Sequence, residues 1–150
     1  MDNSDPVLAW STPIAALIAA GVGGVILGIA ALAAPMEAPG RLLVGLAALG
    51  LLAVSGLGFR QRPRLYVVER PSLLLGINRV RGPVQYRPDQ ITRARIVTYP
   101  RFGRRVPMLE IDVTADEDER LLIYGRWDLG THPQDVLDAL VVRGVVPAED

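Results

Sequence analysis

The chain has 150 residues, enough for one ordinary domain, and its formal charge is zero because 16 arginines balance 16 acids. This balance is a sum over two unlike regions, since residues 1–59 carry very few ionisable side chains and the rest of the chain carries nearly all of them. The absence of cysteine excludes disulfides, thiolate nucleophiles and metals bound through sulfur.

Two uncharged segments lie near the start of the chain, at residues 14–34 and 42–59. A helix rises about 1.5 Å per residue, so each segment is long enough to cross the roughly 30 Å hydrocarbon core of a bilayer. Residues 35–41 form a short external turn, which predicts an antiparallel hairpin. The tail 1–13 is acidic where a cleaved signal peptide would be basic, and its Trp10 suits an interfacial aromatic.

The orientation of this hairpin is predicted by the basic segment 60–64, which follows the second span directly and contains Arg60, Arg62 and Arg64. Arginines beside a span hold that end on the cytoplasmic side. The same three arginines are candidates for contact with the membrane or with a partner. Because there are two spans, both termini are expected in the cytoplasm. The sequence therefore predicts a multi-pass protein of the plasma (inner) membrane.

Small residues recur at every fourth position of the first span, where Ala16, Ala20, Gly24 and Gly28 form a smooth ridge. Such a ridge allows the backbones of two helices to approach closely. The second span of the same chain is the nearest partner for it. Dimerisation of two chains through the ridge is the alternative.

Short, β-prone segments with tight connections begin at Leu65, and six or seven strands are expected. They predict a domain over residues 65–144 that is a meandering antiparallel sandwich or barrel, followed by a tail at 145–150. The expected strands cover residues 65–69, 72–76, 83–88, 91–99, 108–114 and 120–124.

Two of these strands alternate clearly. In residues 108–114, Leu109, Ile111 and Val113 are expected to face the core, and Glu110, Asp112 and Thr114 to face solvent. In residues 91–99 the pattern places Thr92, Ala94, Ile96 and Thr98 on one face and Arg93 and Arg95 on the other.

The last element is an amphipathic helix that begins near Thr131. Thr131 and Gln134 have the spacing of a capping box, and Gly144 stands where a helix is expected to end. His132 is then a solvated residue of the first turn, and Trp127 is expected to cover an open end of the sheet. The apolar stripe of this helix, which should close the sandwich, contains Val136, Leu137, Leu140 and Val141.

Strands followed by one C-terminal helix resemble the bacterial pleckstrin-homology (PH)-like domains of small actinobacterial membrane proteins, which place two spans before the domain. The likeness is carried by RPRLYVVERPSLLLGI, PVQYRPDQITRARI, MLEIDV and RLLIYGRWDLGTHPQDVLDALVVRGV. The resemblance implies a membrane α-hairpin followed by a mainly-β, PH-like antiparallel sandwich or barrel of six to seven strands, closed by the C-terminal helix. Such domains mostly have no assigned catalysis.

Eukaryotic PH domains grip inositol phosphates with basic residues spaced ahead of an Arg-x-Arg pair. Arg70 with Arg79 and Arg81 imitates this pattern. The strand assignment places Arg70 in one turn and the other two beyond the next strand, which argues against phosphoinositide binding by this route.

A basic cluster lies in the expected exposed loop 99–105, where Arg101, Arg104 and Arg105 surround Phe102. An apolar ring flanked by arginines suits an anionic membrane surface or an acidic groove of a protein, and an ordinary solvated loop is the alternative. The acidic run 116–119 lacks the ligand spacing of a calcium loop and is interpreted as a solvated hairpin turn.

These observations favour a non-enzymatic, membrane-anchored interaction module that holds a protein partner at the cytoplasmic face of the membrane. The alternative is a domain that binds or senses anionic lipids or a small ligand. No catalytic set, cofactor or metal site is predicted, since a lone histidine offers too little chemistry. Nucleic-acid binding is disfavoured because acids nearly balance the arginines.

Overall fold

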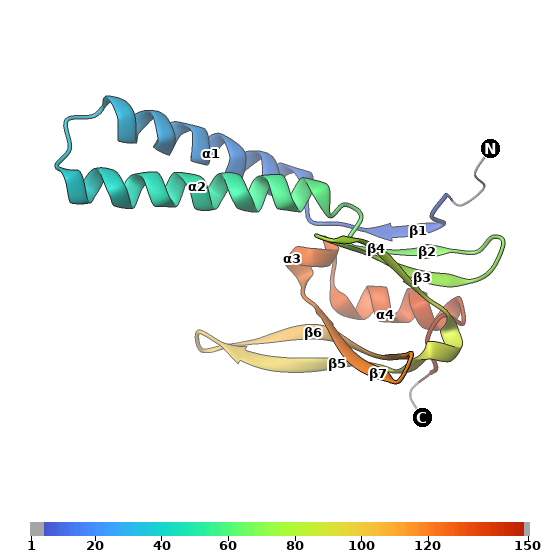
Figure 1. Ribbon diagram of the computed structural model, residues 1–150. Helices are drawn as coiled ribbons and strands as arrows, with labels where there is room; N and C mark the ends of the chain where they lie inside the picture. Colours follow the sequence, from blue (N-terminus) through green and yellow to red (C-terminus); the bar gives the residue numbers. More distant parts are fainter. Residues whose placement is uncertain (1–4, 149–150) are drawn as a thin grey trace. The chain divides into compact units, whose positions relative to one another are not determined.

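The computed structural model describes residues 5–148 and divides into two compact units. One unit is a helical hairpin, residues 12–62, and the other joins the segment up to Ser11 to the chain from Pro63 onward (Figure 1). We call the second unit the β-domain. Two long apolar helices, then antiparallel sheets of four and three strands with a C-terminal helix packed on them, confirm the expected fold class.

The hairpin consists of α1 (Ile14–Ala33) and α2 (Ala38–Arg60). Both helices are long and apolar enough to cross a membrane. The helix α2 begins earlier than the expected start at residue 42, with Pro39 in its first turn, where the missing N–H costs no hydrogen bond. The turn between the helices is therefore shorter than the expected 35–41.

The two helices of the hairpin touch at small residues. Gly24 is buried, and a Cβ atom there would lie 2.8 Å from Cγ of Leu52 and 3.1 Å from the carbonyl oxygen of Ala48. Gly28 also faces Ala48. The glycines of the small-residue ridge thus lie against α2 of the same chain, whereas its two alanines, Ala16 and Ala20, are half-buried.

A hydrogen bond joins the helices at their other end. The Ser55 hydroxyl donates to the carbonyl oxygen of Leu17 at 2.9 Å, in a buried position. Gly58 packs against the Leu17 side chain, and no side chain could replace its hydrogen without displacing that leucine. In apolar surroundings an unpaired hydroxyl would be costly, so this bond favours one register of the two helices.

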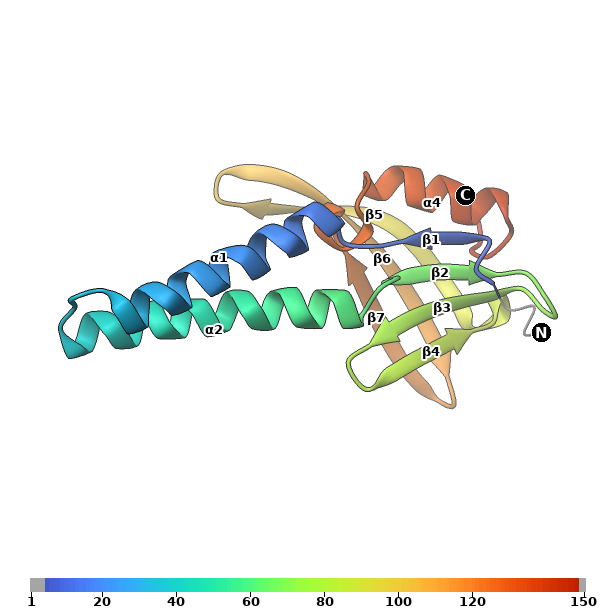
Figure 2. The same ribbon diagram turned by 90° about the horizontal axis from the view of Figure 1, so that it is seen from above.

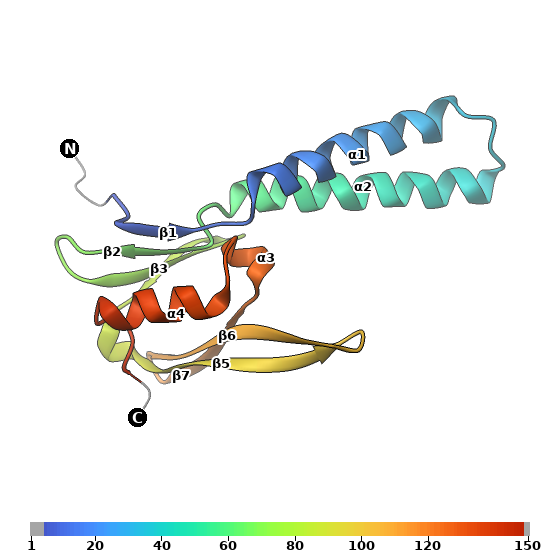
Figure 3. The same cartoon turned by 180° about the vertical axis from the view of Figure 1, so that it is seen from behind.

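The β-domain contains a four-stranded sheet in the order β1-β2-β3-β4 and a three-stranded sheet in the order β5-β6-β7. Figure 2 shows the four strands of the first sheet side by side, with the helix α4 beyond the β1 edge, where it packs on β5 and β6 of the second sheet. In Figures 1 and 3, α4 lies at a level between the two sheets. The strands are β1 (Leu8–Trp10), β2 (Leu65–Val68), β3 (Leu74–Arg79), β4 (Gly82–Tyr86), β5 (Ile91–Arg101), β6 (Arg104–Ala115) and β7 (Asp118–Tyr124). The helical elements are the 3-10 turn η1 (Pro88–Gln90), α3 (Arg126–Leu129) and α4 (Pro133–Val142).

The strand β1 was not predicted, because its segment was interpreted as part of a tail. Leu8 pairs with Val67 and Trp10 with Leu65, so β1 forms one edge of the four-stranded sheet. Both of its outer residues are half-buried against the core. Trp10 therefore packs partly on the β-domain, and its interpretation as an interfacial aromatic stays a prediction.

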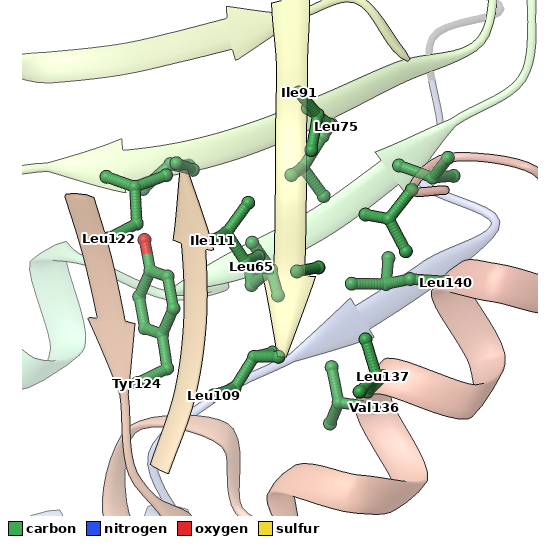
Figure 4. Close-up of a cluster of buried hydrophobic side chains, with 14 of the residues drawn as sticks. Leu65, Leu75, Ile91, Leu109, Ile111, Leu122, Tyr124, Val136, Leu137 and Leu140 are labelled. Atoms are coloured by element: carbon green, nitrogen blue, oxygen red, sulfur yellow. The ribbon is translucent and has the colours of Figure 1, made fainter. Parts of the chain in front are cut away.

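The core of the β-domain lies between the sheets and α4 (Figure 4). Leu109, Ile111 and Val113 of β6 are fully buried there, as their alternation predicts. The helix α4 contributes Leu137 and Leu140 from its apolar stripe. The C-terminal helix thus closes the space between the sheets.

A β-bulge corrects the face assignment in β5. Ile91 pairs with Val113 and the next pair is Arg93 with Asp112, so Thr92 is an extra residue. The bulge turns Ile91 into the core and leaves Thr92 exposed, with its Oγ1 atom 3.2 Å from Oγ1 of Thr114. The expectation that Thr92 shares the inner face with Ala94 was wrong.

The start of α4 also differs from the expected capping box. His132 is the N-cap, and its Nδ1 atom accepts a hydrogen bond from the Gln134 amide at 3.3 Å. The Gln134 side chain donates to Asp138 and the Thr131 hydroxyl donates to Asp135. His132 itself is exposed, as expected.

The position of Trp127 was also predicted incorrectly. Instead of covering the sheet, its side chain is 53% exposed, and Leu129 is the residue of α3 that enters the core.

The closing role of α4 predicts a sharp contrast between two substitutions. Leu140 is 0% exposed and Val142, two residues later on the same helix, is 84% exposed. Leu140→Asp should unfold the β-domain, because burying an unpaired carboxylate costs several kcal/mol, comparable to the whole stability of a small domain. Val142→Asp should change stability little. Protease resistance of the full chain in detergent micelles measures both, and equal resistance of the two variants would contradict the packing of α4.

Candidate functional site

Both connections between the β-domain and the helical hairpin leave the domain at the same end. Only residues 11–13 separate β1 from α1, and only residues 61–64 separate α2 from β2. The Arg64 amide donates to the carbonyl oxygen of Trp10 at 2.9 Å, so the two connections begin on neighbouring strands. We call the end of the β-domain that contains Trp10 and Arg64 the connector end.

The turn between β3 and β4 lies at this connector end. Ile77 pairs with Leu65, and the Asn78 amide donates to the carbonyl oxygen of Arg64 at 3.3 Å. Arg79 and Arg81 follow immediately. Arg70 follows the other end of β2, so the structure does not bring together the three arginines of the inositol-phosphate-like pattern.

The short helix α3 is held at the connector end by an ion pair. Nη2 of Arg64 lies 2.7 Å from Oδ1 of Asp128, and Oδ2 of the same carboxylate accepts from the Gly125 amide at 3.1 Å. Arg64, expected from the sequence to contact a membrane or partner, is thus paired within the domain. This pairing leaves Arg126 and Trp127 of α3 exposed.

The hairpin of β5 and β6 extends past the end of β7 at the connector end. Tyr124, the last residue of β7, pairs with Leu109, and residues 104–108 of β6 continue beyond it (Figure 1). At about 3.4 Å per residue this extension is roughly 17 Å long. The expected loop 99–105 is therefore mostly strand, and only Phe102 and Gly103 form the turn.

The conformation of this turn is unusual for a phenylalanine. Phe102 has φ 49° and Gly103 has φ 74°, which are the two positive values of a two-residue hairpin turn of type I′. Asn-Gly suits such a turn, and a bulky side chain in the left-handed region is uncommon. The Phe102 side chain is fully exposed, at 105%, so packing within the β-domain does not explain its presence.

Arginines without acidic partners gather at the connector end. Among residues 5–148, six arginines there form no ion pair, and the nearby Asp128 is neutralised by Arg64. Acids without partners gather at the opposite end, in and beside the β6–β7 turn, at Asp116, Glu117 and Glu119. The two ends of the β-domain thus carry clusters of opposite charge, although Arg70 and Arg93, which lie outside the connector end, also form no ion pair in the described structure. The six arginines are Arg79, Arg81, Arg101, Arg104, Arg105 and Arg126.

Three large apolar side chains are exposed among these arginines, on three separate turns. They are Val80, Phe102 and Trp127. Of the three, only Phe102 was predicted from the sequence as part of an exposed basic cluster. A signal for the other two was present, because each lies directly beside an arginine, in RVR at 79–81 and RW at 126–127.

The remaining predicted contact residues lie in the helical hairpin or just after it. Arg60 is the last residue of α2 and is exposed, and Arg62 lies in the connection to β2. The acidic run 116–119 forms the tight β6–β7 turn, with positive φ at Asp116 and Glu117. Across the described part of the chain, no three histidine or acidic side chains are grouped so that they could hold a metal ion.

A second surface of interest is the outer face of the three-stranded sheet, which points away from the core. Its centre is Glu110, which is only 2% exposed although its side of the strand was expected to face solvent. Arg95 pairs with this carboxylate at 2.9 Å and the Tyr99 hydroxyl donates to it. The hydrogen bond from Tyr99 and the Arg95 charge outweigh burial and hold the pKa of Glu110 below its usual value, while the same bond raises the pKa of Tyr99.

Apolar side chains flank this network on the outer face. Leu121 and Ile123 of β7 are exposed beside Asp112 and Glu110, and Met108 pairs with Val97 across β5 and β6. Next to them lies an open hollow of about 540 Å³ with both charge signs in its walls. We call this surface the outer sheet face. The hollow is lined by Thr92, Arg93, Asp112, Val113, Thr114, Glu119, Arg120 and Leu121.

The buried carboxylate predicts a specific pH dependence. Because the pKa of Glu110 is lowered in the folded state, its charge stabilises the fold at neutral pH, and that contribution is lost as the pH falls below about 4.5 through the folded pKa. Glu110→Gln should cost about 2 kcal/mol at neutral pH, the usual contribution of a charged hydrogen bond. The variant should lose less stability on acidification than the wild type.

Urea unfolding of the full chain in micelles, at neutral pH and at about pH 3, measures this difference. Glu119→Gln is the matched control, since Glu119 is exposed on the neighbouring strand and has no ion pair in the described structure. An identical acid-induced loss of stability in wild type and Glu110→Gln would contradict the role assigned to Glu110.

Comparison with known proteins identifies relatives from one species. The chain is 38% identical over 136 residues to the uncharacterised proteins Rv0010c and MT0013 of Mycobacterium tuberculosis, strains H37Rv and CDC 1551, and the alignment covers 91% of this chain and 92% of each relative. No protein-family model matches the chain, and no solved structure matches it. Because the alignment spans nearly the full length of both chains, it includes large parts of both the helical hairpin and the β-domain. The chain therefore belongs to the same family as the mycobacterial protein Rv0010c.

Proposed function

We propose that this protein is a non-enzymatic, two-span protein of the plasma membrane that displays its β-domain in the cytoplasm and binds a protein partner there. The proposed topology is supported by the length and apolar character of α1 and α2 and by the arginines at 60, 62 and 64. It is further supported by the order of the elements. Because β1 precedes the start of α1 and β2 follows the end of α2, two spans place both segments of the β-domain on the same side of the membrane.

The arrangement of the β-domain supports a binding role. Two antiparallel sheets with a C-terminal helix that closes the space between them support the architecture implied by the resemblance to PH-like domains. A fold alone supplies no ligand, so the binding surface has to be identified from its side chains. The lone histidine serves as a helix cap, and the proposal gives it no catalytic role.

The proposal of a protein partner rests mainly on the composition of the outer sheet face. Leu121 and Ile123 stand exposed next to one another on one face of β7, as alternate residues of a strand do. The Glu110–Arg95–Tyr99 network lies beside them and fixes the neighbouring side chains, and charged residues of both signs border the patch. An apolar centre within a polar rim is the usual anatomy of a protein interface.

A headgroup-specific lipid pocket receives less support. Arg70 lies at the opposite end of β3 from Arg79 and Arg81, so these arginines cannot converge on one phosphorylated headgroup. The surface with mixed charge and exposed leucine and isoleucine fits a folded protein better than a polyanion.

The test is site-specific photo-crosslinking of the full-length protein in its native membrane. A photoreactive residue at position 121 or 123 should give one discrete protein adduct, and the same residue at position 142, which is exposed on α4, should not. Ile123→Glu should abolish the adduct formed from position 121, because it places a charge in the apolar centre of the interface.

Protease resistance of the Ile123→Glu variant equal to that of the wild type would show that the variant remains folded. Equal adducts from positions 121 and 142, or none from position 121, would contradict binding at the outer sheet face. A C-terminal reporter that is active only outside the cytoplasm would contradict the topology.

A further inference from the structure

We propose that the connector end of the β-domain lies on the anionic cytoplasmic leaflet, with Val80, Phe102 and Trp127 at the interface and the surrounding arginines among the lipid phosphates. This inference rests on the proposed two-span topology and adds a second surface to it. The leaflet contact would orient the β-domain, and it is distinct from the partner contact at the outer sheet face.

The length of the connections limits the distance between this end and the membrane. Residues 11–13 and 61–64 are the only chain between the β-domain and the helices. Even fully extended, at about 3.5 Å per residue, they reach roughly 10 to 14 Å. The connector end is therefore the part of the β-domain that is tethered nearest to the ends of the spans.

The distribution of charge favours this end over any other for a negative surface. Eight arginines of the described β-domain form no ion pair, and all but Arg70 and Arg93 lie there, while Asp128 at the same end is neutralised by Arg64. The unpaired acids Asp116, Glu117 and Glu119 lie at the opposite end, where the leaflet would repel them least. Arginines close to an anionic leaflet are attracted to it within about one Debye length, roughly 10 Å at 0.1 M salt.

Attraction between charges does not account for the exposed apolar side chains, whereas a lipid interface does. Tryptophan and phenylalanine suit the boundary between headgroups and acyl chains. Phe102 occupies a left-handed turn position that Asn or Gly would fill with less strain, and its side chain makes no use of the domain's own core. Each of the three apolar residues is adjacent to an arginine in sequence, so each turn offers an apolar group and a cation together.

The arginines are spread over three separate parts of the chain, which predicts recognition of negative charge without preference for one headgroup. The β3–β4 turn, the β5–β6 turn and α3 each contribute their own cations. The extended β5–β6 hairpin reaches furthest of the three beyond the end of β7. Phe102 is therefore expected to insert deepest.

The lack of cysteine makes a direct test possible, because one introduced cysteine is the only labelling site. An environment-sensitive fluorophore is attached to Phe102→Cys, Trp127→Cys or, as a control at the acidic end, Glu117→Cys. Each full-length protein is reconstituted into vesicles of phosphatidylcholine alone or of equal parts phosphatidylcholine and phosphatidylglycerol. Brominated acyl chains in the same vesicles quench probes that enter the interface.

We expect the probes at 102 and 127 to shift to shorter wavelength and to lose emission with brominated lipid in the anionic vesicles, while the probe at 117 does neither. Both effects should diminish at about 1 M salt, where the Debye length falls to roughly 3 Å. Changing Arg101, Arg104 and Arg105 together to Ser should reduce quenching of the probe at 127, because the turns approach the leaflet as one rigid end. A phosphoinositide added at equal total charge should produce no further quenching.

Probes at 102 and 127 that are quenched no more than the probe at 117 in anionic vesicles would overturn the inference. So would quenching that appears only with a phosphoinositide. Flotation with the vesicles after an alkaline wash tests insertion of the helices separately. Loss of the protein in that wash would contradict the proposed two-span topology and this inference together, whereas retention without quenching would contradict this inference alone.

Discussion

The pairing of β1 with β2 is the constraint on which the rest of the structure depends. It joins a segment before the helical hairpin to the first strand after it, through register pairs from Leu8 with Val67 to Trp10 with Leu65. The chain therefore leaves and rejoins the β-domain through neighbouring strands, and the hairpin becomes an insertion between them. This arrangement defines the connector end, and the role proposed for each surface of the domain depends on its distance from that end.

Two surfaces follow from this arrangement, and they have different chemistry. The connector end combines unpaired arginines with exposed apolar side chains, which suits a negatively charged leaflet. The outer sheet face combines exposed Leu121 and Ile123 with both charge signs and a buried Glu110, which suits a protein. In the proposed function the first surface would orient the domain and leave the second accessible to a partner. Kinship with the mycobacterial protein Rv0010c extends over nearly the whole chain, so the same questions apply to that relative.

Elements with strong periodicity were predictable from the sequence, and those that depend on tertiary pairing were not. The two long apolar helices, the strand around Ile111 and the stripe through Leu140 each carry a repeated pattern that local physics explains. The strand β1 has only three residues and is recognisable only beside β2. Likewise, the bulge at Thr92 is visible only in the register of β5 with β6, and burial of Glu110 requires Arg95 and Tyr99 to fold over it from the next strand.

The most direct test of this account replaces residues 12–62 by a short glycine-containing turn that joins Ser11 to Pro63. The account predicts a soluble, folded β-domain, because Trp10 and Arg64 already share a backbone hydrogen bond and a tight turn can span them. A matched chain that begins at Pro63 lacks β1 and should unfold at a clearly lower urea concentration, since Leu8 and Trp10 no longer cover the core. Equal stability of the two chains, or aggregation of the joined one, would contradict the role of the β1–β2 pair.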